Sequence, residues 1–213
     1  MAEMIDVFDG NHNLLGSLER IAVHQQGLWH QTFHCWIVGE RSGFPFVLLQ
    51  LRSKHKKNYP DFLDITAAGH LEAGEEPLQG IRELEEELGV TVNSGVLKSL
   101  GIKHDIGDEA NGIRNREFAH VFFLRDDREM TSYHLQEDEV SGLVEVGIAD
   151  GLRLFSGEER SLDCRAIRIE DGKIVSFIRK VEAVDLIPRV DNYYLKVFIM
   201  ARLMLEGAHY LSI

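Results

Sequence analysis

Residues 69–90 read GHLEAGEEPLQGIRELEEELGV, a loop with glycines followed by a glutamate-rich segment that contains one arginine. In the second part of this stretch apolar residues recur at intervals of three and four, which predicts an amphipathic helix over 77–88. Its buried stripe is expected to consist of Leu78, Ile81, Leu84 and Leu88. Gly89 follows at the place where a residue in the left-handed conformation commonly ends a helix.

The glutamates of this helix are spaced so that they can act together. Glu83, Glu86 and Glu87 stand at i, i+3 and i+4, so their side chains project from one face within about 5–6 Å of one another. Like charges at this spacing destabilise an isolated helix, whereas hard cations such as Mg²⁺ or Mn²⁺ require oxygen ligands. A glutamate-rich surface helix is the alternative, and for the helix alone it is the better explanation. Gly69 and Gly74 change this balance, because they let the backbone of the preceding loop approach a metal or a phosphate closely.

The whole stretch resembles the Nudix box, G-x5-E-x7-R-E-U-x-E-E-x-G-U, in which U is a bulky aliphatic residue. The matching positions are Gly69, Glu75, Arg82, Glu83, Leu84, Glu86, Glu87, Gly89 and Val90. One departure is that six residues, instead of seven, separate Glu75 from Arg82. Because the shortening falls at the start of the helix, it affects the placement of Glu75 and leaves the glutamate cluster unchanged.

The resemblance implies an α+β fold of the Nudix type, an α/β/α sandwich with a mixed sheet, and a hydrolase that requires Mg²⁺ or Mn²⁺. The implied metal ligands are Glu83, Glu86, Glu87 and the carbonyl oxygen of Gly69. One of these glutamates, or a carboxylate from a later loop, would orient or deprotonate the attacking water, with Glu83 and Glu86 as the catalytic candidates. The residues with an implied structural role are Glu75, Arg82 and Gly89.

Upstream residues resemble the branch of the family that includes type 1 isopentenyl-diphosphate isomerase. Residues 27–38 and 48–75 carry this resemblance, and Glu117 matches a glutamate of the isomerase site. Metal-binding histidines of the isomerase correspond to His24, His30 and His70. Arg52 and Lys56 match residues that grip the diphosphate, which suits the bidentate pairing of a guanidinium with phosphate.

Two positions depart from the isomerase. Ala68 stands where the isomerase carries its catalytic cysteine, and Asn115 stands where it has a second glutamate. Without the thiol, proton addition and removal across a carbon–carbon double bond lacks half of its acid/base pair. The chain therefore resembles the isomerase in its framework and the hydrolases in its chemistry.

Several of these candidates have ordinary alternatives. His24 and His30 precede or open a strand, where a histidine is more often a surface or satisfied core residue. The basic run RSKHKK at 52–57 is either a solvated loop or the local anion attractor of an acidic chain. Glu117 lies on a predicted strand and its side chain could face either way. The acidic run LQEDEV at 135–140 could offer a further carboxylate to the site, although an exposed loop is the default.

The rest of the chain predicts a strand-rich centre with helices packed on it. Strands are expected over 29–40, 44–53, 95–107, 115–127 and 139–147, with a polar loop at 54–64. Hairpins are expected near the N-terminus, turning at Gly10–Asn11, and over 165–179, turning at Asp171–Gly172. Further helices are expected near 148–155 and over 190–206, between Asp191 or Asn192 and Gly207.

We expect one domain over 1–213, with a core at about 30–150, an N-terminal extension over 1–29 and a C-terminal extension over 151–213. The C-terminal extension could cover the core, shape the pocket or form a homodimer interface, because YYLKVFIMARLML at 193–205 is apolar enough to require burial.

Composition narrows the classes of partner and compartment. The formal net charge of −12 disfavours binding to nucleic acid and to anionic membranes, so phosphate must be met by local cations or metal ions. The two cysteines form no disulfide framework, and Cys35 lies in an apolar run where burial is expected. No apolar run approaches the length of about 18–20 residues that spans a bilayer. These features predict a cytoplasmic protein.

The predicted function is divalent-metal-dependent hydrolysis of a small-molecule diphosphate, such as a nucleoside diphosphate derivative or a related organic diphosphate, by water attack at phosphorus. The alternatives are an enzyme like isopentenyl-diphosphate isomerase and a non-catalytic sensor of a nucleotide diphosphate. No motif identifies a base, a sugar or a lipid.

Overall fold

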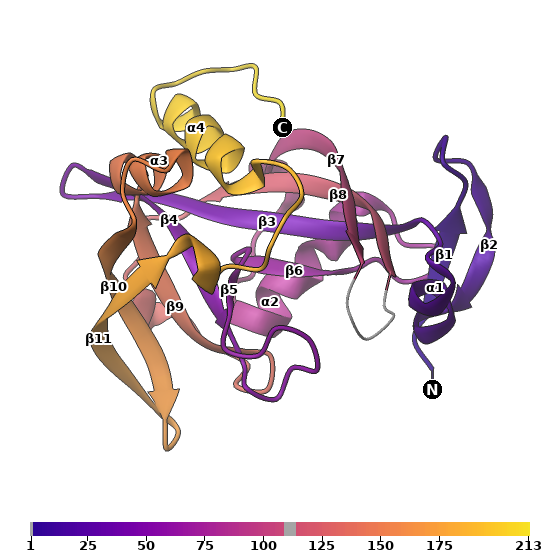
Figure 1. The fold of residues 1–213 in the computed structure, drawn as a ribbon, viewed down its shortest axis with the longest axis horizontal. Helices are drawn as coiled ribbons and strands as arrows, with labels where there is room; N and C mark the ends of the chain where they lie inside the picture. The colour runs from indigo at the N-terminus through magenta and orange to yellow at the C-terminus, as the bar shows by residue number, and fades with distance from the viewer. Residues whose placement is uncertain (1, 109–113) are drawn as a thin grey trace.

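The computed structural model describes residues 2–108 and 114–213, and one mixed β-sheet lies at its centre (Figure 1). In spatial order, its main strands are β11 (Lys173–Glu182), β10 (Ser161–Glu170), β9 (Val140–Gly147), β4 (Phe44–Arg52), β3 (His30–Arg41), β8 (Arg114–Arg125) and β7 (Lys98–Asp108). β3 and β8 run parallel, whereas the other described pairs in this sheet run antiparallel. The mixed sheet with few helices confirms the predicted α+β class.

Two short strands lie in and beside the segment that the sequence predicted as a loop. β5 (Leu63–Asp64) pairs with β4, and β6 (Ala67–His70) pairs with β3. In the second pair Gly69 lies opposite Phe33, so the glycine loop of the box is fixed on the central sheet. Alternation of polar and apolar residues is too short in these two strands to be recognised from sequence.

The two faces of the sheet carry two separate cores. On one face α2 (Arg82–Leu88) packs through Leu84 and Leu88. On the opposite face lie α3 (Ile148–Ser156) and α4 (Tyr193–Leu205), which contact each other and cover the second core (Figure 1). This arrangement is the predicted α/β/α sandwich.

The helix expected over 77–88 is correct in its second half and wrong in its first. Residues Pro77–Ile81 form a 3₁₀ helix, η1, and α2 follows directly. Leu78 is 45% exposed and leaves the predicted buried stripe, because the 3₁₀ turn changes the angular spacing of its side chains. A 3₁₀ helix rises about 2.0 Å per residue against about 1.5 Å in an α-helix, so fewer residues cover the same length. The shortened segment between Glu75 and Arg82 lies in this 3₁₀ region.

The N-terminal extension is a hairpin followed by a helix that the sequence did not indicate. β1 (Met4–Phe8) pairs with β2 (Leu14–Glu19), as predicted, and α1 (Arg20–Gln26) follows. The hairpin contacts the box loop through two hydrogen bonds, from Gly74 N to Asp6 Oδ2 at 2.8 Å and from Ala73 N to Met4 O at 2.9 Å. This part of the chain is therefore a wall beside the box.

The C-terminal extension is the predicted hairpin and helix. β10 and β11 turn at Asp171 and Gly172, both with positive φ, and α4 begins after Asn192. Tyr193, at the start of α4, is fully buried and its hydroxyl oxygen accepts a hydrogen bond from Trp36 Nε1 at 3.0 Å. Across the described residues, no helix is long and apolar enough to cross a membrane.

The remaining short elements connect these parts. They are the 3₁₀ turns η2 (Ser94–Val96), η3 (Met130–Ser132) and η4 (Ala183–Asp185). Cys35 is fully buried, as expected, and burial raises the pKa of its thiol well above the usual range. A buried thiol of this kind is a core residue and has no access to a ligand.

Candidate active site

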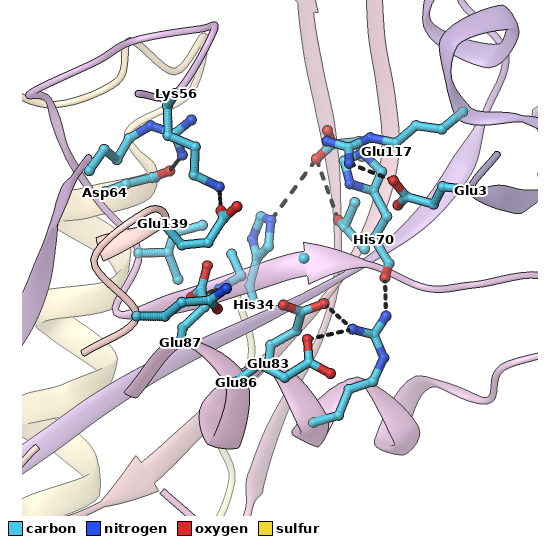
Figure 2. A pocket seen from close by; sticks show the side chains of 18 of the residues that line it. Glu3, His34, Lys56, Asp64, His70, Glu83, Glu86, Glu87, Glu117 and Glu139 are labelled. Carbon is cyan, nitrogen blue, oxygen red and sulfur yellow. Dashed lines mark hydrogen bonds and ion pairs between the residues drawn. The ribbon is translucent and has the colours of Figure 1, made fainter. Parts of the chain in front are cut away.

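A cavity of about 390 Å³ lies where β6, α2 and the ends of β3, β4 and β8 meet. Figure 2 shows acidic side chains pointing into it from several elements. One wall is the box, His70 lines a second side, and a floor is made by strand residues and the segment ahead of α4. The volume falls in the range of small-molecule sites.

The box wall places three carboxylates against the glycine loop. A Cβ on Gly69 would lie 2.1 Å from Glu83 Oε1, so only glycine permits the carboxylate to lie this close to the backbone. Glu87 is buried and accepts a hydrogen bond from Ala68 N at 3.3 Å. The side chain of Glu86 is 53% exposed and lies at the open side of the cavity. These positions bring together the glutamates and the glycine that the sequence grouped.

Arg82 holds this wall together. Its guanidinium donates to Glu75 at 3.0 and 3.2 Å, to Glu83 at 2.6 Å, to Glu86 at 3.3 Å and to the carbonyl oxygen of His70 at 2.9 Å. Burial would lower the pKa of Arg82, but the hydrogen bonds to Glu75 and the neighbouring carboxylates raise it. Burial also opposes ionisation of Glu75, yet pairing with Arg82 lowers the pKa of Glu75. Thus Glu75 reaches Arg82 despite the shortened connection.

The electrostatics of the wall favour a bound cation. Burial and the carboxylate of Glu83 raise the pKa of Glu87 to about 8, and burial raises the pKa of Glu83 although Arg82 opposes this shift. Carboxylates that are buried beside one another resist ionisation unless a positive charge neutralises them. Oxygen donors of this kind fit a hard divalent ion, which Glu83, Glu86, Glu87 and the carbonyl of Gly69 could hold.

His24, His30 and His70 form a second group of potential ligands, the histidine wall; of these three residues His70 lines the cavity. His24 Nε2 lies 3.1 Å from His70 Nε2, and the rings of His30 and His70 stack with their centroids 5.2 Å apart. One ring nitrogen from each of these histidines lies within 4.8 Å of the others. Burial lowers the pKa of each, to about 4 for His30. Neutral imidazoles are the form that ligates metals.

His30 is oriented for such a role. Its Nδ1 lies 3.0 Å from the carbonyl oxygen of Leu28, which fixes Nδ1 as the protonated nitrogen and leaves Nε2 as an acceptor. That Nε2 is buried without a hydrogen-bond partner among the described residues, and Glu117 Oε1 lies 3.9 Å away. Glu117 faces the cavity, and burial together with the charge of Asp105 raises its pKa to about 7. The sequence left the direction of the Glu117 side chain open, and the structure places it on the cavity side of β8.

The two candidate phosphate-binding residues differ in their availability. Arg52 lines the cavity, but its nitrogens already donate to Tyr59 O at 3.1 Å, to Asn58 O at 3.0 Å and to Asp64 at 3.2 Å. Lys56 also lines the cavity and pairs with Glu139 at its rim. A single flexible partner leaves Lys56 able to turn toward a phosphate, whereas Arg52 holds the loop after β4.

Two arginines that line the cavity carried no recognisable signal in the sequence. Arg189 comes from the segment ahead of α4, and Arg20 from the N-terminal extension. Glu139 belongs to the acidic run that the sequence offered as a possible source of a further carboxylate, and it lies at the cavity rim. Their distances along the chain from the box give no local pattern, so only the fold brings them to the site.

Comparisons with known proteins agree with this geometry. Residues 28–161 match the family model of the NUDIX domain. The chain is 33% identical over 195 residues to an uncharacterized Nudix hydrolase of Clostridium acetobutylicum, covering 90% of this chain and 93% of the relative. It is 31% identical to Nudix hydrolase 3 of Arabidopsis thaliana, covering 77% of this chain and 22% of that protein. It is also 32% identical to an isopentenyl-diphosphate Delta-isomerase of Streptomyces griseus, covering 57% of this chain and 60% of the isomerase.

Solved structures show the same fold. DR0079 from Deinococcus radiodurans superposes with a TM-score of 0.57 at 19% identity, covering 74% of this chain and 91% of that one. A MutT/nudix family protein from Enterococcus faecalis gives a TM-score of 0.51 at 11% identity, and the match covers 84% of this chain and 64% of that one. The chain belongs to the Nudix family, and the family model and the Nudix hydrolase relatives identify it as a Nudix hydrolase. The resemblance to the isomerases is likewise confirmed.

Proposed function

We propose that this chain hydrolyses a diphosphate bond in a nucleoside diphosphate derivative or a related organic diphosphate, with Mg²⁺ or Mn²⁺ as cofactor. The observation that supports this most directly is the contact of Glu83 with Gly69 beside the buried Glu87. It gathers oxygen donors whose charge requires a cation, at the wall of a cavity that also holds Lys56 and Arg20.

In this proposal Glu83, Glu86, Glu87 and the Gly69 carbonyl hold the divalent ion. When bound, the ion would neutralise charge on the diphosphate and lower the pKa of the attacking water. Glu86, at the open side, or Glu83 would orient that water and accept its proton. Lys56 would swing from Glu139 to a phosphate oxygen, and Arg82 would keep the carboxylates in place.

The test compares two glutamates of the same helix. Glu86→Gln is expected to lower kcat by about 100-fold or more, because it removes a ligand and a proton acceptor while keeping the size of the side chain. Glu85→Gln is the matched control, since Glu85 is exposed on α2 and is not among the described residues that line the cavity. Products should be identified over a panel of diphosphates in Mg²⁺ and in Mn²⁺. A wild type that turns over no diphosphate with either metal contradicts the proposal.

Isomerisation of a prenyl diphosphate is the second candidate, supported by the isomerase relatives and by the histidines beside Glu117. Against it stands Ala68, which lines the cavity, and no cysteine is among the described residues that line it. Migration of the double bond in isopentenyl diphosphate, assayed in Mg²⁺, would favour this candidate. Binding of a nucleotide diphosphate without turnover would instead favour a sensor, for which the complete glutamate cluster has no use.

The histidine wall supports a further part of the proposal, a second cation held by His24, His30 and His70 near Glu117. Three nitrogen donors suit a borderline metal such as Zn²⁺ better than they suit Mg²⁺. A metal held by these histidines would lie beside the box site, because one of its ligands, His70, lines the same cavity as Glu83.

A further inference from the structure

The imidazole of His34 joins the floor of the cavity to the C-terminal extension. The residues of this floor are Thr32 and His34 from β3, Asp64 from β5, Glu117 from β8 and Arg189 from the segment ahead of α4. On one edge of the ring, His34 Nε2 lies 4.0 Å from Glu117 Oε2 (Figure 2). On the other edge, His34 Nδ1 lies 3.1 Å from the hydroxyl oxygen of Tyr193, the first residue of α4. One ring nitrogen therefore faces the cavity, and the other is held from behind.

The neighbours of the Tyr193 hydroxyl determine where its proton points. Trp36 Nε1 donates to the hydroxyl oxygen at 3.0 Å, and an indole N–H can only donate. The hydroxyl proton itself needs an acceptor, because Tyr193 is fully buried and an unpaired buried donor is costly. His34 Nδ1 is the acceptor that the described residues offer within hydrogen-bond distance. The Tyr193 hydroxyl thus donates to Nδ1 of His34.

This hydrogen bond fixes the tautomer of His34. A neutral imidazole carries one ring proton, so a ring whose Nδ1 accepts a hydrogen bond holds that proton on Nε2. Burial and the charge of Arg189 lower the pKa of His34 to about 3, and burial raises the pKa of Tyr193 well above its usual range. His34 and Tyr193 therefore stay neutral around pH 7. The cavity receives an N–H donor from His34, and a protonated Nε2 has no electron pair with which to ligate a metal.

This N–H is the donor that the floor keeps available for a ligand. Its distance of 4.0 Å from Glu117 Oε2 is too long for a hydrogen bond, and no other described residue accepts one from it. The remaining donors of the floor are already engaged. Thr32 Oγ1 donates to Glu117 at 3.4 Å, and the guanidinium of Arg189 donates to Asp64 at 3.1 Å and to Asp105.

A phosphate oxygen is the acceptor that such a donor suits under the proposed hydrolysis. Negative charge grows on the bridging oxygen of a diphosphate as its bond to phosphorus breaks. A neutral donor that is buried and held rigid stabilises this charge without having to reorganise during the reaction. The ring of His34 meets both conditions, because β3 carries it and Tyr193 fixes its far edge.

We propose that His34 donates its Nε2–H to an oxygen of the diphosphate from the cavity floor, and that Tyr193 is the positioning residue that holds His34 in this tautomer. This inference rests on the proposed hydrolase and adds a catalytic residue to it. Water forms the new bond to phosphorus, and the electron pair of the broken P–O bond stays on the leaving oxygen. The Nε2 proton remains on His34 throughout. Through Tyr193, the C-terminal extension acts on the reaction.

The first experiment observes the tautomer directly in the full-length protein. Nitrogen-15 NMR of histidine-labelled protein should show His34 with a protonated Nε2 and an unprotonated Nδ1 from about pH 6 to 8. His34→Gln identifies the resonances by their loss. Methylenediphosphonate, an analogue that cannot be hydrolysed, added with Mg²⁺ should shift the Nε2–H proton resonance. A protonated Nδ1 in the wild type, or an Nε2–H resonance that no concentration of the analogue moves, would overturn the proposal.

The second experiment measures kcat and KM in Mg²⁺ with a diphosphate that the wild type hydrolyses. Tyr193→Phe should populate the tautomer protonated on Nδ1 and lower kcat about three- to tenfold with KM nearly unchanged, because the donor is then missing in part of the molecules. Tyr194→Phe is the matched control, since this neighbouring buried tyrosine donates to Ile187 O at 2.8 Å and is not among the described residues that line the cavity. It should change neither kcat nor the tautomer. Equal losses of kcat in the two variants would overturn the role of Tyr193.

Two substitutions of His34 test the donor even if Tyr193→Phe fails to fold. His34→Phe keeps a ring without a donor and should lower kcat by about 100-fold. His34→Gln keeps an N–H close to the place of Nε2 and should lower kcat by less than about tenfold. Equal losses in these two variants would overturn the proposal and leave the hydrolase proposal standing. A wild type that turns over no diphosphate would remove the hydrolase proposal, whereas the tautomer seen by NMR would remain as described.

Discussion

The box wall and the cavity floor are built in opposite ways. The wall is contiguous, since Gly69, Arg82 and the three glutamates all lie within 69–90 and meet through short-range contacts. The floor is assembled from strands β3, β5 and β8 and from Arg189 in the C-terminal extension. A contiguous motif preserves chemistry that depends on fixed spacing, whereas a dispersed surface can change with the parts that supply it. The wall thus depends on local spacing, and the floor depends on the packing of the whole chain.

The largest effect is expected where the wall is tightest. Gly69→Ala should lower kcat by about 100-fold, because the new Cβ would lie 2.1 Å from Glu83 Oε1 and displace that carboxylate. Gly10→Ala is the control, since its Cβ meets nothing within 4 Å and its φ is not positive. Steady-state kinetics on any diphosphate that the wild type hydrolyses measure kcat for both variants. Full activity of Gly69→Ala would show that Glu83 need not lie against the backbone.

The next effect concerns the arginine that joins the wall. Arg82→Lys should reduce the free energy of unfolding by about 1–2 kcal/mol, because a lysine cannot reproduce the fork to Glu75, Glu83 and the His70 carbonyl. Denaturant titration measures this change. Arg153→Lys, on the exposed surface of α3, also sits beside two carboxylates and should leave the free energy of unfolding nearly unchanged. Equal losses in the two variants would mean that the fork has no special role.

The histidine wall is expected to act through metal affinity. His24→Gln should weaken Zn²⁺ or Mn²⁺ binding by about tenfold or more, because even residues that only support a metal ligand contribute that much. Isothermal titration of metal into the metal-free protein measures the change. His209→Gln, at an exposed position near the C-terminus, serves as the control. Unchanged binding in His24→Gln would return these histidines to the role of packed aromatic rings.

The smallest expected effect is on the pH dependence of stability, to which Glu87 in the box wall and Glu117 in the cavity floor contribute at different pH values. The pKa of Glu87 is raised to about 8 and that of Glu117 to about 7, against an ordinary value of 4.5. Below about pH 7 the buried histidines, whose pKa values are lowered, bind fewer protons in the folded protein and act in the opposite direction. From about pH 7 to 8 these histidines are neutral in both states, so the two carboxylates dominate and the stability of the metal-free protein falls as pH rises. Thermal unfolding midpoints should drop by a few degrees over this range.

Addition of Mg²⁺ and substitution of each glutamate distinguish the contribution of Glu87 to this pH dependence from that of Glu117. Mg²⁺ should stabilise the protein more at pH 8 than at pH 5.5, since protons compete with the cation for the carboxylates. Glu87→Gln should remove the part of the pH dependence nearest pH 8, and Glu117→Gln the part nearest pH 7, whereas Glu85→Gln should remove neither. A midpoint that rises between pH 7 and pH 8 in the metal-free wild type would contradict the burial of both carboxylates.

Sequence-based prediction was most accurate for elements that depend on interactions between residues close together in the chain. The long strands, both hairpins and the helices at 148–156 and 193–205 obey local periodicity and appeared near their expected positions, whereas the short strands β5 and β6 were missed. The first turn of the box helix was predicted wrongly, because a 3₁₀ turn beginning at Pro77 absorbs the shortened connection. Helix α1 was missed because its seven residues bury only Val23 and so carry almost no apolar pattern.

The amino-acid sequence by itself determined the family, the sandwich of helices on a mixed sheet, and the grouping of Glu83, Glu86 and Glu87. Helical spacing fixes those side chains on one face wherever the helix is placed. Only the tertiary structure decided that Glu117 faces the cavity, that His24 meets His70, and that Arg189 reaches the floor from the far end of the chain. These contacts join residues distant in sequence, and their geometry depends on strand register and packing, which no local pattern encodes.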